Sequence, residues 1–176
     1  MIKEPIVVTN ILTNKDNEYI LSLLMERNFK IGKEANSTRM QSALHKDCKH
    51  VGFTHITCDI EENQLLNMND PLNVYASIVV NKIVETANIK FNFINRIHWN
   101  YYLQGQEGIG HVDKNTDNYL SILYNIQTTD GGTEILGKFY KDSEGEAKIF
   151  KSNWIHKGFS TKEDKARTSL NIVLHL

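Results

Sequence analysis

The sequence predicts an α+β fold, or a β-barrel supported by helices, in which helices come first and antiparallel strands follow. Apolar residues in the first half recur at helical spacing, whereas the chain after about residue 90 consists of short aromatic and β-branched segments separated by Gly, Asp and Asn. A length of 176 residues suits one domain with its own core. Helices followed by a run of strands favour α+β over an alternating α/β fold.

Two stretches of the first half are predicted to be helices. Residues 11–29 place apolar side chains near helical spacing, and Thr13 or Asn14 is a suitable N-cap. Residues 69–89 carry a second apolar stripe, with Asp70 as N-cap and Pro71 in the first turn, where proline is tolerated. Between them, residues 30–60 are polar and irregular, and we expect short strands and loops there.

The second half is predicted to contain six strands. They are residues 96–104, 118–126, 132–140, 146–153, 154–160 and 168–176. The segment Thr-Thr-Asp-Gly-Gly at 128–132 predicts a hairpin turn because Asp-Gly and Gly-Gly accept positive φ, and residues 142–146 predict a second turn.

Polar and apolar side chains alternate in two of these strands, so each strand has one polar face. The polar faces comprise Arg96, His98, Asn100 and Tyr102 in one strand and Arg167, Ser169 and Asn171 in the other. Such faces usually point to water. They can also line a cavity, and the arginine beside a serine favours this second interpretation.

Composition excludes several classes of function. The 20 Lys and Arg balance 21 Asp and Glu, so the chain lacks the positive excess that attracts nucleic acid or an anionic membrane. No apolar run reaches the roughly 20 residues of a membrane span, the first residues lack a secretory pattern, and two cysteines do not make a disulfide framework. We therefore expect a soluble, cytoplasmic protein.

Three residues have the chemistry of a metal site. His111 and Asp113 are two positions apart, which puts both side chains on one face of a strand, and His156 lies in a later predicted strand. Two histidines and one carboxylate form the facial triad of non-haem iron oxygenases, which leaves three of six coordination positions open.

Arg167 and Ser169 follow the last of these residues on one face of the final strand. A guanidinium offers a planar fork that matches a carboxylate, and a serine hydroxyl adds a further donor. An anion site one strand from a metal site suits a dicarboxylate whose keto-acid end binds the metal.

The order of these residues resembles the Fe(II)/2-oxoglutarate-dependent dioxygenases, in particular their prolyl-hydroxylase-like branch. The similarity spans residues 97–176 and lies in the motifs Y-x-x-G at 102–105, H-x-D at 111–113, Leu-Tyr at 123–124, Gly-Gly-Thr at 131–133, the segment 150–156 and Arg-Thr-Ser at 167–169. The chain departs from the branch in Asn125-Ile126, which replaces Leu-Asn, and in Arg167, which replaces the lysine of collagen-type enzymes.

The resemblance implies a double-stranded β-helix (jelly roll) in a single domain over residues 1–176, with residues 1–90 as helical support and substrate-side loops and 91–176 as the core. It implies that His111, Asp113 and His156 bind iron. It further implies that Arg167, with Tyr124 and Ser169, holds the distal carboxylate of 2-oxoglutarate, and that Tyr102 lines the co-substrate pocket. From identity alone, the two tyrosines could equally be core aromatics.

The implied activity is hydroxylation of an unactivated C–H bond, on a protein or peptide side chain, with Fe(II), 2-oxoglutarate and O2 and with ascorbate as a stimulant. Small members of this family occur in bacteria and bacteriophages, so a phage-encoded enzyme acting in the host cytoplasm fits the resemblance. The alternatives are a hydroxylase of free amino acids or other small molecules, a nucleobase demethylase, which the charge balance disfavours, and a non-catalytic cupin-like metal-binding module.

A second group of metal-binding residue types occurs between residues 45 and 58. It consists of His45, Cys48, His50, His55 and Cys58. Zinc takes such ligands, but the spacing lacks paired C-x-x-C motifs, which favours solvated or half-buried residues of a mobile segment over a zinc module. The resemblance implies a different role, in which this region forms loops over the active site that recognise substrate. His98 could likewise be a further metal ligand or part of the cavity wall.

Overall fold

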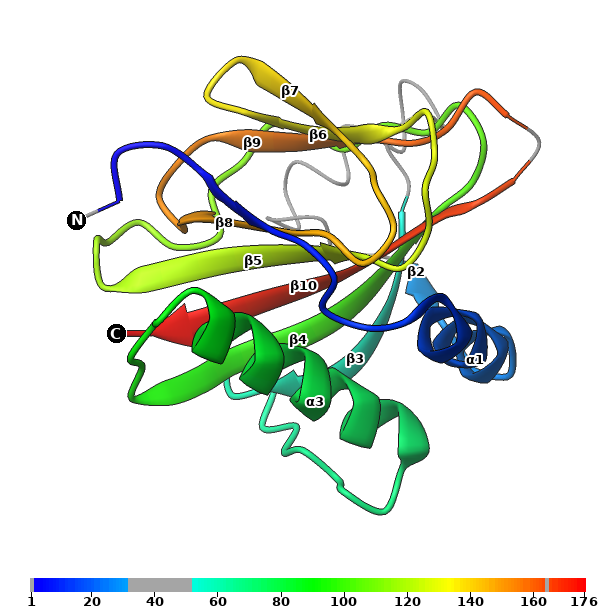
Figure 1. Ribbon diagram of the computed structural model, residues 1–176, viewed down its shortest axis with the longest axis horizontal. Coiled ribbons are helices and arrows are strands. Elements are labelled where there is room, and N and C mark those ends of the chain that lie inside the picture. Colours follow the sequence, from blue (N-terminus) through cyan, green and yellow to red (C-terminus); the bar gives the residue numbers. More distant parts are fainter. Residues whose placement is uncertain (1, 32–51, 164) are drawn as a thin grey trace.

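The computed structural model describes residues 2–31, 52–163 and 165–176, which form two helices and ten strands (Figure 1). In chain order the elements are β1 (Ile6–Val8), α1 (Asn14–Met25), β2 (Lys30–Ile31), β3 (Phe53–Asp59), α3 (Pro71–Thr86), β4 (Phe93–Tyr102), β5 (Tyr119–Asn125), β6 (Gly132–Ile135), β7 (Lys138–Lys141), β8 (Ala147–Lys151), β9 (His156–Phe159) and β10 (Arg167–His175). Neither of the helices in the described ranges is long and apolar enough to cross a membrane.

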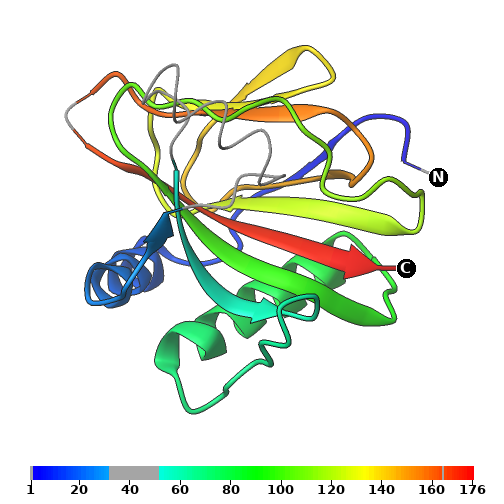
Figure 2. The same ribbon diagram turned by 180° about the vertical axis from the view of Figure 1, so that it is seen from behind.

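The strands form two antiparallel sheets. The large sheet has seven strands in the order β1-β8-β5-β10-β4-β3-β2, and the small sheet has three in the order β7-β6-β9. Both helices lie against one face of the large sheet, and the small sheet lies over the other face (Figures 1 and 2). This arrangement confirms the α+β jelly roll with helical support. The first 90 residues also add β1, β2 and β3 to the edges of the large sheet.

Both helices begin at the predicted caps. Thr13 and Asp16 form a capping box at α1: the threonine hydroxyl accepts from the Asp16 amide at 3.3 Å, and the Asp16 carboxylate accepts from the Thr13 amide at 3.2 Å. Asp70 accepts from the Leu72 amide at 2.9 Å and caps α3. The same Asp70 carboxylate pairs with Arg27 at 2.8 Å, which ties the end of α1 to the start of α3.

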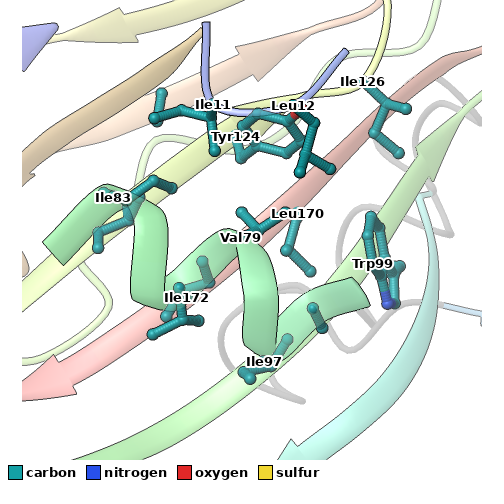
Figure 3. Packing of buried hydrophobic residues seen from close by; sticks show 14 of the residues in the cluster. Ile11, Leu12, Val79, Ile83, Ile97, Trp99, Tyr124, Ile126, Leu170 and Ile172 are labelled. Carbon is teal, nitrogen blue, oxygen red and sulfur yellow. The ribbon is translucent and has the colours of Figure 1, made fainter. Parts of the chain in front are cut away.

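The core lies between the helices and the large sheet (Figure 3). Val79 and Ile83 of α3 pack on Ile97 of β4 and on Leu170 and Ile172 of β10, and all five side chains are fully buried. These residues have the alternation expected of strands with one apolar face. The opposite, polar faces of β4 and β10 therefore point toward the small sheet.

The structure corrects the two predicted hairpin turns. Residues 128–132 lead from β5 in the large sheet to β6 in the small one, and residues 142–146 lead back from β7 to β8, so both segments cross between sheets. The real hairpin turn divides the segment 132–140, which was expected to be one strand, at Leu136 and Gly137 with φ of 51° and 80°. Because leucine seldom adopts positive φ, residue type gave no signal for this turn.

Candidate metal centre and co-substrate pocket

A cavity of about 510 Å³ lies between the two sheets. Its lining includes every residue of the two polar faces identified above, namely Arg96, His98, Asn100, Tyr102, Arg167, Ser169 and Asn171. The cavity interpretation of the alternating strands is therefore confirmed. Leu123 of β5 and Thr133 of β6 close the cavity from neighbouring strands.

His111, Asp113 and His156 converge in this cavity. The Nε2 atom of His111 lies 3.8 Å from one carboxylate oxygen of Asp113, and Nε2 of His156 lies 3.6 Å from the other. Ligand atoms of the three residues all lie within 4.8 Å of one another, and in the described part of the chain they are the one group of three such residues that can hold a metal ion.

The backbone joins the two histidines directly. The His111 amide donates to the His156 carbonyl at 3.0 Å, and the His156 amide donates to the His111 carbonyl at 2.9 Å. Asp113 is held separately, since its amide donates to the Ser152 carbonyl at 2.9 Å. His111, in a loop, and His156, at the start of β9, therefore form an antiparallel backbone bridge, and the Asp113 carboxylate lies beside it.

Both imidazoles are oriented for metal binding. Nδ1 of His111 lies 2.8 Å from the Ile109 carbonyl oxygen, and Nδ1 of His156 lies 3.0 Å from the Trp154 carbonyl oxygen. These contacts fit an Nδ1–H donor, which leaves the Nε2 lone pair directed at the shared position. Two imidazoles and one carboxylate are donors that suit Fe(II), so the residues present fit a facial triad.

Asp113 is a fully buried carboxylate beside the Arg96 guanidinium and the two imidazole rings. Burial alone raises its pKa, but the Arg96 guanidinium, the two imidazoles and the Ser121 hydroxyl outweigh burial and hold the pKa well below its usual range. Ser121 donates to Asp113 at 2.5 Å and lies 2.8 Å from Ser152. The carboxylate is therefore ionised and fixed in orientation, as a metal ligand must be.

Arg167 is buried and firmly held at another part of the cavity. Its side chain is 2% exposed. Its Nε donates to one oxygen of Asp142 at 2.5 Å, and its Nη2 donates to the other at 3.2 Å and to Thr133 at 3.0 Å. Lys148, buried on β8, lies 3.9 Å from Asp142 and 3.0 Å from Glu146. Asp142 thus fixes the plane of the guanidinium by a bidentate contact.

Tyr102 and Ser169 lie beside Arg167. Tyr102 is the residue opposite Arg167 across β4 and β10, and its ring centre lies 5.7 Å from the guanidinium carbon. Ser169 is the next cavity-facing residue of β10. Gly158 of β9 leaves space in front of Arg167 and Tyr102. A Cβ atom at this position would lie 3.2 Å from Arg167 Nη1 and 3.7 Å from the Tyr102 hydroxyl.

Tyr124 does not face this cavity, which corrects the role implied by the resemblance. Its ring is fully buried in the core on the helix side of the large sheet, and its hydroxyl donates to Asn17 Oδ1 at 2.6 Å (Figure 3). Burial raises the pKa of Tyr124. Successive residues of a strand point to opposite faces, so Leu123 and Asn125 lie on the cavity side of β5.

Asn125 joins the network around Arg167. When the oxygen and nitrogen of its side-chain amide are exchanged to match the neighbouring donors and acceptors, the amide nitrogen donates to Asp142 at 3.2 Å.

The other predicted metal-binding residues do not join the triad. His98 lines the cavity but its Nε2 lies 2.9 Å from Asp59 Oδ2, and burial, with Arg96 nearby, lowers the pKa of His98. Cys58 packs in the hydrophobic core, and His55 Nδ1 contacts the Asn28 carbonyl oxygen at 3.3 Å. The remaining members of that group, His45, Cys48 and His50, lie outside the described residues.

The sequence analysis assigned no role in the site to three of its charged residues. Arg96 donates to Asp113, and Asp142 and Lys148 form the buried network around Arg167. Arg96 had a signal, because it belongs to the polar face of its strand. Lys148 also had one, since it interrupts an apolar strand, whereas nothing distinguishes Asp142 from an ordinary turn aspartate.

No protein-family profile and no curated protein match the sequence. Solved structures do match the fold. A prolyl-4-hydroxylase of Pseudomonas putida aligns with a TM-score of 0.65 and 11% identity over 98% of this chain and 93% of that chain. A prolyl hydroxylase of Trichoplax adhaerens, in complex with a hypoxia-inducible factor peptide, aligns with a TM-score of 0.66 and 13% identity over 98% and 83%.

A third neighbour is the non-haem α-ketoglutarate-dependent epimerase SnoN from nogalamycin biosynthesis, with a TM-score of 0.67 and 9% identity over 98% of this chain and 78% of that chain. The chain therefore has the jelly-roll fold of 2-oxoglutarate- and Fe(II)-dependent oxygenases. At these identities the comparison concerns the fold, and the site must be argued from the residues of this chain.

Proposed function

We propose that the protein is an Fe(II)- and 2-oxoglutarate-dependent dioxygenase that hydroxylates an unactivated C–H bond. The observation that carries this proposal is the convergence of His111, Asp113 and His156 in the same cavity as the buried cation Arg167. A facial triad alone is compatible with a simple metal-binding module. A fixed guanidinium in the same cavity is what a dicarboxylate co-substrate requires.

Each residue has a distinct role in this proposal. The three ligands hold the iron, which when bound supplies the chemistry that uses O2 to oxidise a C–H bond. Arg167, Tyr102 and Ser169 hold the distal carboxylate of 2-oxoglutarate, and Asp142 and Thr133 keep the guanidinium in place. In the overall reaction, 2-oxoglutarate, O2 and R–H give succinate, CO2 and R–OH, so one oxygen atom enters each product.

For the substrate, we propose a protein or peptide side chain. The support is the fold shared with prolyl hydroxylases, one of which was solved with a bound peptide. A small-molecule substrate is the second candidate, supported by the fold shared with an enzyme of nogalamycin biosynthesis.

The direct test is succinate formation by the purified protein with Fe(II), 2-oxoglutarate, ascorbate and O2, followed by NMR. We expect slow succinate production even without a prime substrate, and its loss when Fe(II) is chelated or replaced by Zn(II). A protein that binds Fe(II) but neither forms succinate nor changes its visible absorption when 2-oxoglutarate is added would instead be a metal-binding module.

A pair of tyrosine variants tests the two roles separately. Tyr102→Phe is expected to raise the KM for 2-oxoglutarate about two- to tenfold, the effect of one hydrogen bond. Tyr124→Phe is expected to leave this KM unchanged and to lower the free energy of unfolding by about 1–3 kcal/mol, because the buried Oδ1 of Asn17 loses its hydrogen-bond donor. Steady-state kinetics and chemical denaturation provide the two measurements. The reverse pattern would restore Tyr124 to the co-substrate pocket.

A further inference from the structure

A second arginine lines the cavity at the other end of the same strand face. Arg96 lies six residues before Tyr102, the cross-strand partner of Arg167, so about 20 Å of β4 separates the two positions. The Arg96 guanidinium contacts the metal-ligand carboxylate, since its Nη2 donates to Asp113 Oδ1. The metal ligands therefore lie next to Arg96, and Arg167 marks the part of the cavity assigned to the co-substrate.

The two arginines differ in how their charge is balanced. Arg167 has its own carboxylate in Asp142, which plays no part in the metal site. Among the described residues, Arg96 forms one ion pair, with Asp113, and its Nε donates to Oδ1 of the neutral Asn171 at 3.1 Å. In the described part of the chain, Nη1 of Arg96 has no hydrogen-bond partner, and the side chain is 25% exposed.

A bound divalent ion changes the balance around Arg96. Asp113 then shares its single negative charge between the ion and the guanidinium, so the positive charge of Arg96 is only partly compensated. A partly buried cation in such a place is stabilised by an anion. The distal carboxylate of the co-substrate is not that anion, because it is assigned to Arg167.

The lining around Arg96 adds polar groups, and the other acids near it have partners of their own: Asp59, opposite Arg96 on β3, pairs with His98. His98, Asn100 and Asn171 lie on the same strand faces. Glu61, the further acid of the lining, pairs with Lys114. This polar lining offers few apolar contacts to a proline ring. A negatively charged substrate group could accept hydrogen bonds from Nη1 of the Arg96 guanidinium.

We propose that Arg96 binds a carboxylate of the substrate and so places the neighbouring C–H bond beside the metal ligands. This inference rests on the proposed function and specifies its substrate class as carboxylate-bearing molecules. A carboxylate is favoured over a phosphate, since a single arginine matches one negative charge by its planar fork. The carboxylate belongs either to a free amino acid or to an acidic residue of a peptide.

Binding to a redox-inert complex tests the proposal without turnover. The protein is loaded with Mn(II) and N-oxalylglycine, an inert analogue of 2-oxoglutarate, and titrated by calorimetry with two panels. One panel holds the free L-amino acids and their carboxamides, and the other holds short peptides with Asp or Glu and the same peptides with Asn or Gln. We expect at least one acid to bind about ten- to a hundredfold more tightly than its amide, and the panel that contains it identifies the source.

Variants separate substrate binding from positioning of the metal ligand. Arg96→Gln is expected to remove the preference for the acid over its amide while Mn(II) and N-oxalylglycine still bind, and Arg96→Lys to keep part of it. Lys151→Gln is the matched control, because it removes one positive charge from a residue that pairs with Asp117 away from the cavity lining, and it should retain the preference. If Arg96→Gln weakens only Mn(II) binding and leaves the acid-to-amide ratio unchanged, Arg96 merely positions Asp113 and the proposal is wrong.

The wild-type protein gives the other decisive outcomes. If it binds Mn(II) and N-oxalylglycine but prefers no acid over its amide in either panel, the substrate class is wrong while the proposed function stands. If N-oxalylglycine does not bind to the Mn(II)-loaded protein at all, the proposed function itself fails, and this inference fails with it.

Discussion

Asp113→Ala is expected to weaken Fe(II) or Mn(II) binding by more than about a hundredfold and to abolish succinate formation. Asp113 is the single anion among the three ligands, and even the outer partners of metal ligands are typically worth about 10- to 100-fold in affinity. Metal binding is measured anaerobically by calorimetry for Fe(II) and by electron paramagnetic resonance for Mn(II). Circular dichroism checks that the sheet remains folded.

Ser121→Ala is the matched variant for this experiment. It removes the hydroxyl that donates to Asp113 but keeps all three ligands, so we expect metal affinity between that of the wild type and that of Asp113→Ala. His111→Ala should resemble Asp113→Ala. If Asp113→Ala binds the metal with wild-type affinity, the assigned metal centre is incorrect.

Arg167→Ala is expected to have two large effects. It leaves Asp142 buried without its bidentate partner, which lowers the free energy of unfolding by about 3–5 kcal/mol. It also raises the KM for 2-oxoglutarate about ten- to a hundredfold, the value of a charge-assisted contact. Urea denaturation and succinate kinetics measure the two effects.

The double variant Arg167→Met with Asp142→Leu separates these effects. Replacing a buried ion pair by apolar residues is often neutral, so we expect stability close to wild type while the KM remains high. Lys148 keeps its contact with Glu146 in this variant. A single Arg167→Ala variant with unchanged co-substrate dependence would give the arginine a purely structural role.

Local patterns made much of the fold predictable. Thr13 and Asp70 satisfy backbone amides within three residues of themselves, so their capping role is visible in the sequence. The polar faces of β4 and β10 follow from the two-residue period of a strand. The predicted metal triad combined one local pair, His111 and Asp113, with His156, which was assigned from its position in a later predicted strand and from the order of the motifs.

Features that depend on distant contacts could not be predicted in the same way. Asp142 meets Arg167 across 25 residues and three changes of sheet, and no local pattern marks such a pair. The Asp-Gly-Gly segment has the composition of a hairpin turn, but strand pairing elsewhere makes it a connection between sheets. The motif placed Tyr124 in the co-substrate pocket, but the neighbouring residue Leu123 is the one that lines the cavity. Successive residues of a strand point to opposite faces, so this difference of one position puts Tyr124 in the core.

The backbone bridge between His111 and His156 has a consequence for how an ion enters and leaves. Because each residue donates to the other's carbonyl, two of the three ligands form a unit whose spacing is set before any ion arrives. Binding then requires little rearrangement of the histidines, and Asp113, which is held separately by Ser152 and Ser121, completes a ligand set that is formed in advance.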